Sequence, residues 1–546
     1  MTGSLKVELK HQNENNSKSS PGLEISEMAD SETGEVFRDQ DGGNETALEK
    51  NFDIWGVVGI VYSSIGTPLA LGTYLSTVIG VGGAPFFFYT YLFAGFFCLL
   101  TAYSMSEFAS VHPHSSALVY WTHLYAPQNY ARPLAYLSGI LSCACWIFGM
   151  TATGFFVADL VLGLVYMHHP DYVSQTYHYY LIFLASVVFA AGFNIFGTRL
   201  IPLLSRVVTY VINLGTLFTL VALLARAHPK RTAAFAFKDV TNTTGWSSNG
   251  VVFFISMLPT TATVTLFDGA CHMTDEIPNP KKNIPIVIAY GYTGAYLIGF
   301  VSVLVYNFCI VNPDNLLDPV GGIPLFQLYV DSLHNDGLAT VSALIIIVAF
   351  LLASVGLLTS TSRLVMSFAD FNALPFGKAI GSVNTKLNAP VWAIMFVAVL
   401  TCLIGLLIFA SSTALNAVSG SFVSTMYVAY LIPFVALVLK KDRYGKGVKP
   451  LFNLGRWGKP MNIICIVWFL FASAWLCVPS YVPVTANTMN YTVAVLGATA
   501  FVAFANWFAY ARKHFSIGII KEIESEEEIE EEIVEEIVEE VHAKAQ

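Results

Sequence analysis

Long apolar segments recur along most of this chain and are separated by short polar connections. A helix that spans a membrane needs about 20 predominantly apolar residues. Twelve segments meet this requirement, and they lie at residues 54–80, 84–106, 134–165, 179–198, 201–225, 250–272, 284–310, 337–363, 390–410, 413–439, 460–480 and 489–511. The pattern therefore predicts an all-α integral membrane protein with twelve transmembrane helices.

The two ends of the chain are polar, unlike the segments between them. Residues 1–50 are rich in serine, asparagine, glycine and glutamate, which is typical of disordered segments. Residues 514–546 place Ile529 and Ile533 four positions apart among glutamates, which predicts an acidic amphipathic helix. We expect a twelve-helix domain over residues 51–513 between these tails. The acidic tail either docks on a cytoplasmic partner or on basic loops of the same chain, or it stays solvated.

The composition supports a membrane protein. Of the 546 residues, 55% are hydrophobic and only 12% are charged, which is unusual for a soluble protein of this length. The formal net charge of −9 comes from the tails, because residues 51–521 carry 22 basic and 14 acidic side chains. The eight cysteines lie in or beside apolar segments without paired spacing, so we predict neither a disulfide framework nor a metal site.

Lysine and arginine are distributed unequally between alternate connections. If the amino terminus is inside, the outer connections carry only Arg226, Lys230, Arg231 and Lys238. Basic residues accumulate in the cytoplasmic loops of membrane proteins, which predicts that both termini are cytoplasmic. The sequon at Asn242 would then face outward, and we predict that Asn242 is glycosylated.

Two apolar segments contain residues that interrupt helices. Irregular backbone inside a bilayer is tolerated only where it lines a cavity or is buried in protein, so such interruptions mark candidate sites. Pro68 lacks a backbone donor, and Gly66 and Gly269 permit unusual dihedral angles. The candidate binding residues at the two interruptions are Ser63, Ser64, Gly66, Thr67, Thr263, Thr265, Phe267 and Asp268. Because the interrupted segments are the first and the sixth, they are expected to correspond in an inverted repeat.

Asp268 is the candidate with the most specific chemistry. A carboxylate near mid-membrane is costly and commonly binds a cation or carries a proton. The alternative is a structural aspartate that caps the interrupted helix.

Phe267 and Trp146 either contribute cation–π faces for an amine or pack in the core. The small polar residues either bind substrate or permit close helix packing, and Asp159 is either a surface carboxylate or a vestibule residue that attracts cations.

Three strings in the sequence resemble a known family. They are EIPNPKKNIP after the sixth segment, SEFASVHPHSSALVYWTHLYAPQNYARPLAYLSG between the second and third, and SRLVMSFADFNALPF after the eighth. In order and spacing they resemble the amino acid–polyamine–organocation superfamily, specifically its fungal amino acid/choline branch. The resemblance covers residues 52–512 and implies a five-plus-five inverted repeat with broken helices 1 and 6, plus two extra helices.

The resemblance also favours a proton over sodium as the coupling ion. Some relatives carry a coupling lysine in the fifth span, where this chain offers Asn213, so a mechanism based on lysine is in doubt. The alternative is coupling to sodium, with the hydroxyls of residues 359–362 beside Arg363 as its ligands.

These patterns predict a secondary active transporter of a small amine-containing solute, such as an amino acid, GABA or choline. The resemblance implies alternating access and proton-coupled import across the plasma membrane. An exporter, a vacuolar transporter and a non-transporting nutrient receptor are the alternatives. The sequence contains no nucleophile–base set or phosphate-binding loop, so we expect no enzyme, no cofactor and no nucleic acid partner.

Overall fold

The computed structural model describes residues 52–67, 69–441, 444, 450–486 and 488–517. The predicted disordered tail at 1–50 and the acidic tail from residue 518 onward lie outside the described residues. Helices dominate the described part, which confirms the all-α class. The strands in that part are β1 (Val81–Gly82) and β2 (Thr241–Asn242), which pair antiparallel with Val81 opposite Asn242.

The elements of the first half include the two interrupted segments. In chain order they are α1 (Ile54–Ile65), η1 (Leu69–Tyr74), α2 (Leu75–Gly80), β1, α3 (Gly83–Val111), α4 (Leu118–Tyr125), α5 (Gln128–His168), α6 (Thr176–Phe196), η2 (Thr198–Leu200), α7 (Ile201–Arg226), α8 (Ala233–Phe237), β2, α9 (Asn249–Ile255), α10 (Leu258–Thr263) and η3 (Cys271–Glu276).

The second half begins with a long helix after the predicted connector. Its elements are α11 (Pro280–Cys309), η4 (Asp314–Leu316), η5 (Val320–Gly322), α12 (Pro324–Leu333), α13 (Asp336–Asp370), α14 (Gly377–Ile380), α15 (Val391–Gly405), α16 (Leu407–Ala410), α17 (Ser412–Gly420), α18 (Phe422–Leu439), η6 (Gly455–Trp457), α19 (Gly458–Trp475), α20 (Thr492–Asn506), the π-helical turn η7 (Trp507–Ala511) and α21 (Arg512–His514).

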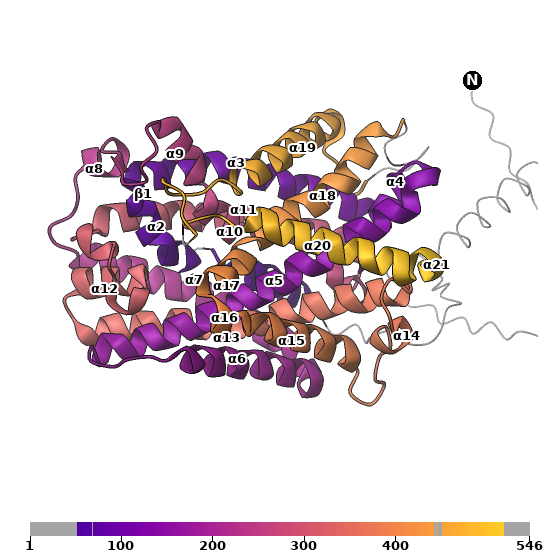
Figure 1. The fold of residues 1–546 in the computed structure, drawn as a ribbon, viewed down its shortest axis with the longest axis horizontal. Coiled ribbons are helices and arrows are strands. Elements are labelled where there is room, and N and C mark those ends of the chain that lie inside the picture. The colour runs from indigo at the N-terminus through magenta and orange to yellow at the C-terminus, as the bar shows by residue number, and fades with distance from the viewer. Residues whose placement is uncertain (1–51, 68, 442–443, 445–449, 487, 518–546) are drawn as a thin grey trace, which may run out of the picture. The chain divides into compact units, whose positions relative to one another are not determined.

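Ten helical stretches of the described residues are long and apolar enough to cross a membrane. They occupy residues 83–111, 128–168, 176–196, 198–226, 280–309, 336–370, 391–410, 422–439, 455–475 and 492–514. Each overlaps one of the predicted segments, and several of these helices run roughly parallel to one another in Figure 1.

The two predicted segments without a long helix are 54–80 and 250–272. In the first, α1 ends at Ile65, where Gly66 adopts a left-handed conformation with φ 61°, and the chain resumes as the 3-10 helix η1. In the second, α10 ends at Thr263, and the backbone of residues 264–270 is not helical before η3 begins. Both interruptions thus fall at the glycine and hydroxyl residues that the sequence singles out.

Some helices differ in length from the apolar segments that predicted them. The helix α3 extends past residue 106 because Glu107 is buried and paired, accepting from Tyr444 Oη and the Leu454 N–H, each at 3.1 Å. The segment 413–439 is divided into α17 and α18 at Ser421, directly after Gly420, a residue with low helix propensity. Local hydropathy therefore underestimates a helix whose polar residues find buried partners.

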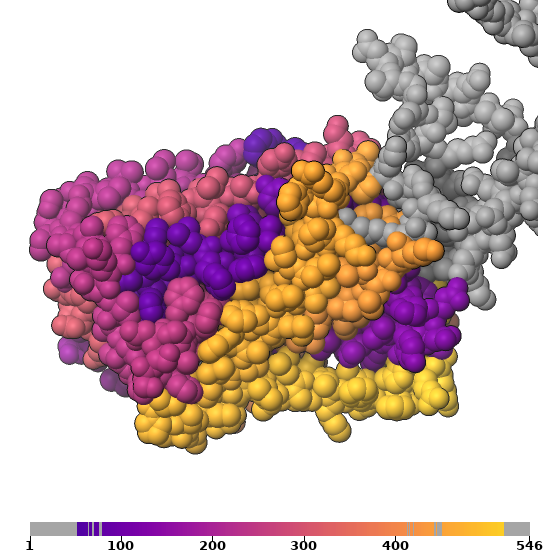
Figure 2. All heavy atoms as spheres, turned by 90° about the horizontal axis from the view of Figure 1, so that it is seen from above, coloured from indigo at the N-terminus to yellow at the C-terminus, as the bar shows by residue number. Residues whose placement is uncertain are grey.

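Large apolar side chains are exposed on the long helices of the C-terminal part. Helices α19 and α20 carry exposed Val467, Leu470, Phe501, Val502 and Phe504. The orange and yellow C-terminal segments cover part of one face in Figure 2. An apolar surface of this kind is what a lipid bilayer covers.

The interrupted segments pack among the long helices. The helix α1 contacts α7, α11 and α13, and α10 contacts α3 and η1. The helix α5 contacts both α13 and α18. This packing surrounds the two interruptions with α5, α7, α13 and α18, which together form the walls of the site.

Candidate functional site

The two helix interruptions lie side by side. The Thr67 hydroxyl, just after the end of α1, donates to the Thr263 carbonyl oxygen at the end of α10 over 2.7 Å. Residues from both interruptions then line one cavity, namely Ser63, Ile65 and Gly66 from the first and Ala262, Thr263, Thr265 and Leu266 from the second. The cavity has about 730 Å³ of empty space, including its open part.

Other helices complete the walls of this central cavity. On α5, the lining residues Gly149, Ala152, Thr153 and Phe156 recur at helical spacing, so they present one face of that helix. The remaining lining residues come from η1, α7, α13 and α18, and they are Ala70, Tyr74, Ile212, Ala349, Phe350, Ala353, Leu357 and Phe422. None of the described residues that line the cavity carries a charge.

Three hydroxyl side chains of the cavity use their hydrogens in local bonds. Ser63 Oγ donates to the Gly59 carbonyl at 2.9 Å, Thr153 Oγ1 to the Gly149 carbonyl at 2.9 Å and Thr263 Oγ1 to the Pro259 carbonyl at 2.8 Å. A hydroxyl that donates its one hydrogen keeps oxygen lone pairs as acceptors. The cavity is therefore rich in hydrogen-bond acceptors, and its aromatic rings add negative π-faces.

The second interruption is held open by side chains from other helices. Tyr292 Oη of α11 lies 2.6 Å from the Thr265 carbonyl oxygen and 2.8 Å from that of Leu266, and it can donate to either. The Leu266 N–H and the Thr265 hydroxyl both point to Met426 Sδ of α18, at 3.1 Å. Because these backbone groups have partners outside the helix, the chain can remain non-helical here.

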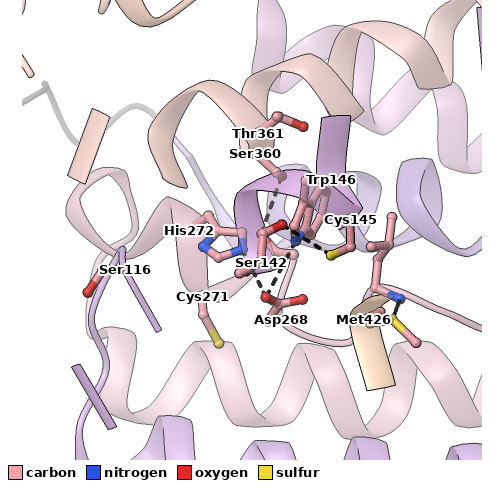
Figure 3. A network of polar contacts seen from close by, with 12 residues as sticks. Ser116, Ser142, Cys145, Trp146, Asp268, Cys271, His272, Ser360, Thr361 and Met426 are labelled. Atoms are coloured by element: carbon pink, nitrogen blue, oxygen red, sulfur yellow. Dashed lines mark hydrogen bonds and ion pairs between the residues drawn. The ribbon is translucent and has the colours of Figure 1, made fainter. Parts of the chain in front are cut away.

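Asp268 is fully buried at the centre of a polar network (Figure 3). Tyr430 Oη donates to Asp268 Oδ1 at 2.6 Å. Trp146 Nε1 donates to Asp268 Oδ2 at 3.4 Å, and His272 Nε2 lies 3.1 Å from the same oxygen. Residues from η3, α5 and α18 thus converge on one carboxylate.

His272 connects this network to the loop that follows α3. Its Nδ1 lies 2.7 Å from the Ser115 carbonyl oxygen, which can only accept, so Nδ1 carries a hydrogen. In the same loop, His114 Nδ1 faces the Ser116 N–H at 3.0 Å, and its ring stacks on Tyr120. Burial lowers the pKa of His114 to about 4, and its geometry as an acceptor agrees with a neutral ring.

A second buried ionic contact joins η3 to α13. Arg363 Nε donates to Glu276 Oε1 at 2.8 Å, and both side chains are almost completely buried. Arg363 Nη1 also lies 3.1 Å from Ser362 Oγ and 3.4 Å from Asn194 Oδ1 of α6. The guanidinium therefore lies among the hydroxyls that the sequence offered as sodium ligands, such as Thr359, which donates to Asn194 Oδ1 at 2.9 Å.

The structure does not bring all the predicted site residues to one place. Ser63, Gly66, Thr263 and Thr265 line the central cavity. Asp268 and Trp146 belong to the buried network, Phe267 packs on Tyr292 with ring centroids 4.7 Å apart, and Thr67 bridges the interruptions. The side chain of Ser64 lies outside the described residues. Asn242 is exposed in β2, and its glycosylation stays a prediction.

Sequence reasoning did not single out His272, Tyr292, Met426 and Tyr430. His272 follows Asp268 by four residues, a spacing that could have indicated a pair. Tyr430 and Met426 lie about 160 residues further along the chain, and no local signal connects them to the interruption.

A family match covers nearly the same part of the chain as the resemblance seen in the sequence. The sequence pattern of the family described as "Amino acid permease" matches residues 52–500. The chain belongs to this amino acid permease family. The resemblance inferred from its three strings is therefore confirmed.

Similar proteins of fungi are transporters. The choline transporter of Saccharomyces cerevisiae is 28% identical, over 88% of this permease and 85% of its own length. Amino-acid permease 2 of Neurospora crassa is 26% identical, over 87% of each chain. The swainsonine transporter swnT of Arthroderma benhamiae is 29% identical, over 87% of this permease and 93% of its own length. The chain is thus a multi-pass membrane permease of small organic solutes.

Proposed function

We propose that the permease is a secondary active importer of a small amine-containing solute, such as an amino acid, GABA or choline. It works by alternating access, with the central cavity at the two helix interruptions as the substrate site. The observation that carries the proposal is the chemistry of this cavity, which combines hydroxyl acceptors and aromatic faces without a charged side chain. An ammonium group is matched by such surroundings.

Named residues contribute different parts of this recognition. The hydroxyl oxygens of Ser63, Thr263 and Thr265 accept from the amine. The rings of Tyr74 and Phe156, with centroids 6.1 Å apart, supply apolar and π-surfaces for the rest of the solute.

The membrane arrangement is also part of the proposal. Residues 54–80 and 250–272 form spans 1 and 6, and each of them is broken. Together with the ten long helices they give twelve membrane spans. Spans 1–5 and 6–10 form the inverted repeat. The distribution of lysine and arginine supports cytoplasmic termini, and the plasma membrane is the proposed location.

The geometry of the Asp268–His272 pair supports coupling to protons. Since His272 Nδ1 carries a hydrogen, a neutral ring would turn the lone pair of Nε2 toward Asp268 Oδ2. The 3.1 Å contact is favourable only when a second proton lies on one of these two atoms. That proton is the proposed coupling proton. The fixed charge of Arg363 beside Thr359 and Ser362 disfavours sodium there.

Uptake by purified permease in proteoliposomes tests the proposal. We expect radiolabelled amines to accumulate when the lumen is alkaline, and Thr265→Val to weaken apparent affinity about fivefold, because one acceptor is worth about 1 kcal/mol. Thr209→Val is the matched control, since the Thr209 hydroxyl donates to the Ser205 carbonyl in α7 and does not line the cavity. Absence of uptake across a panel of amines, or equal affinities for the two variants, would contradict the proposal.

A further inference from the structure

A second cavity adjoins the central one along α5. It is lined by residues of α5, among them Phe155, Phe156 and Asp159, by Ser174 of the connection before α6, by Thr176 and Tyr179 of α6, and by residues 408–415 of α16 and α17. Ala152 and Phe156 line both cavities. With about 1370 Å³ of empty space, counting its open part, this vestibule can hold a small solute.

The spacing on α5 leads directly from one cavity to the other. Ala152, Phe155, Phe156 and Asp159 lie at positions i, i+3, i+4 and i+7, so they share one face of the helix. Asp159 therefore lies three residues beyond Phe156, about 4.5 Å further along the helix axis. Phe156 also contacts Phe350 of the central cavity, with ring centroids 5.7 Å apart. An aromatic boundary thus separates Asp159 from the proposed substrate site.

Asp159 is the charged residue among the described residues that line the vestibule. Within the described part of the chain, no side chain or backbone group forms a hydrogen bond or ion pair with its carboxylate. The side chain is half-buried in a transmembrane helix. A carboxylate without a partner at such a position is costly unless a cation or water reaches it.

We propose that the vestibule is a capture subsite for solutes that carry an ammonium group, with Asp159 as its ionic partner and Phe155, Phe156 and Tyr179 as its aromatic walls. The position of this subsite on the import path, before the central cavity, rests on the proposed function. A cation attracted to Asp159 has a raised local concentration next to Phe156, whereas an anion is repelled. The vestibule therefore selects by charge, and the uncharged central cavity selects by shape and hydrogen bonding.

Chemical labelling tests the subsite without requiring transport. Thr176 lines the vestibule and is exposed, so Thr176→Cys provides a reporter in a background in which Cys402 and Cys477, the cysteines that are not buried, are replaced by serine. The rates of its reaction with trimethylammonioethyl and sulfonatoethyl methanethiosulfonate give a ratio that measures the local charge. We expect Asp159→Asn to lower the cation-to-anion ratio at least threefold at low salt.

The matched control is Asp171→Asn. Asp171 is an exposed carboxylate in the connection between α5 and α6 and does not line the vestibule. The same charge change at Asp171 should leave the cation-to-anion ratio within a factor of two. Asp159→Glu keeps the charge and should keep the ratio. An equal effect of Asp159→Asn and Asp171→Asn would overturn the proposal.

Protection by a cation gives a second readout on the unaltered Asp159. Tetramethylammonium should slow the labelling of Thr176→Cys by an uncharged maleimide, and the slowing should disappear in Asp159→Asn. Absence of protection with Asp159 present would overturn the subsite even if Asp159→Asn fails to fold. A permease that shows both charge effects but takes up no amine would contradict the proposed function and leave the subsite in place.

Discussion

Replacement of Asp268 by asparagine separates the chemistry of the buried network from its shape. The amide oxygen can still accept from Tyr430, and the amide N–H can donate to a neutral His272 Nε2. The Trp146 N–H, which now donates to Oδ2 at 3.4 Å, then faces the amide nitrogen and loses its acceptor. A buried donor without a partner costs about 1–3 kcal/mol, which a folded membrane protein tolerates. The main loss is the shared proton, since asparagine cannot exchange it.

The magnitude of the effect on transport follows from the coupling. One pH unit is worth about 1.4 kcal/mol per proton, so a permease that imports one proton with each solute accumulates it about tenfold across a gradient of one unit. In proteoliposomes, Asp268→Asn should reduce this ratio to about one, while counterflow exchange of substrate continues. His272→Gln should have the same effect, because it removes the other half of the pair.

The same assay distinguishes a role for Asp268 in binding the amine. Direct contact with the ammonium would be worth roughly 1–3 kcal/mol, so Asp268→Asn would weaken the affinity in counterflow tenfold or more. We expect no such change, because Asp268 does not line the central cavity. Asp171→Asn is the control for a loss of one carboxylate at the surface. Wild-type accumulation and pH dependence in Asp268→Asn would refute the proton-coupling argument.

Three further predictions concern the backbone, the topology and the pH dependence of stability. Gly66→Leu should abolish uptake but leave surface expression intact, because Gly66 has φ 61° and lines the cavity. Gly192→Ala is the control and should transport normally, because no heavy atom lies within 4 Å of the added carbon. Normal uptake by Gly66→Leu would show that the substrate site is not at this interruption. A cysteine at residue 240 should react with an impermeant maleimide on intact cells and one at residue 445 should not, because the proposed topology places 240 outside and 445 inside. The reverse labelling pattern would show that the topology is inverted. Because the pKa of His114 is lowered from 6.5 to about 4 by burial, the unfolded chain binds the extra proton first, and stability should fall as the pH drops from about 6.5 to about 4. His114→Gln should reduce this fall in Tm, by an amount worth at most about 3 kcal/mol, and an unchanged pH dependence would contradict the neutral buried ring.

The amino-acid sequence alone determined the class of the protein and the places where its helices break. Ten of the predicted segments overlap long apolar helices, because the hydrocarbon thickness requires a run of apolar residues that can be counted along the chain. Gly66 and the stretch around Thr265 and Asp268 were identified for a local reason as well. Glycine, proline and hydroxyl residues affect the backbone bonds of their own turn.

Only the tertiary structure decided which side chains meet at these breaks. The sequence left Asp268 open between binding a cation, carrying a proton and capping the helix. In the structure Trp146, His272 and Tyr430 surround it, and two of these are more than 100 residues away in the sequence. The walls that α5 and α13 contribute to the central cavity have no motif of their own. Their apolar faces follow the same helical pattern as any buried face, and hydropathy does not record which helix they oppose. Glu107 in α3 and Arg363 in α13 depend on the tertiary structure for the same reason, because a buried polar residue is stable only when a distant partner satisfies it.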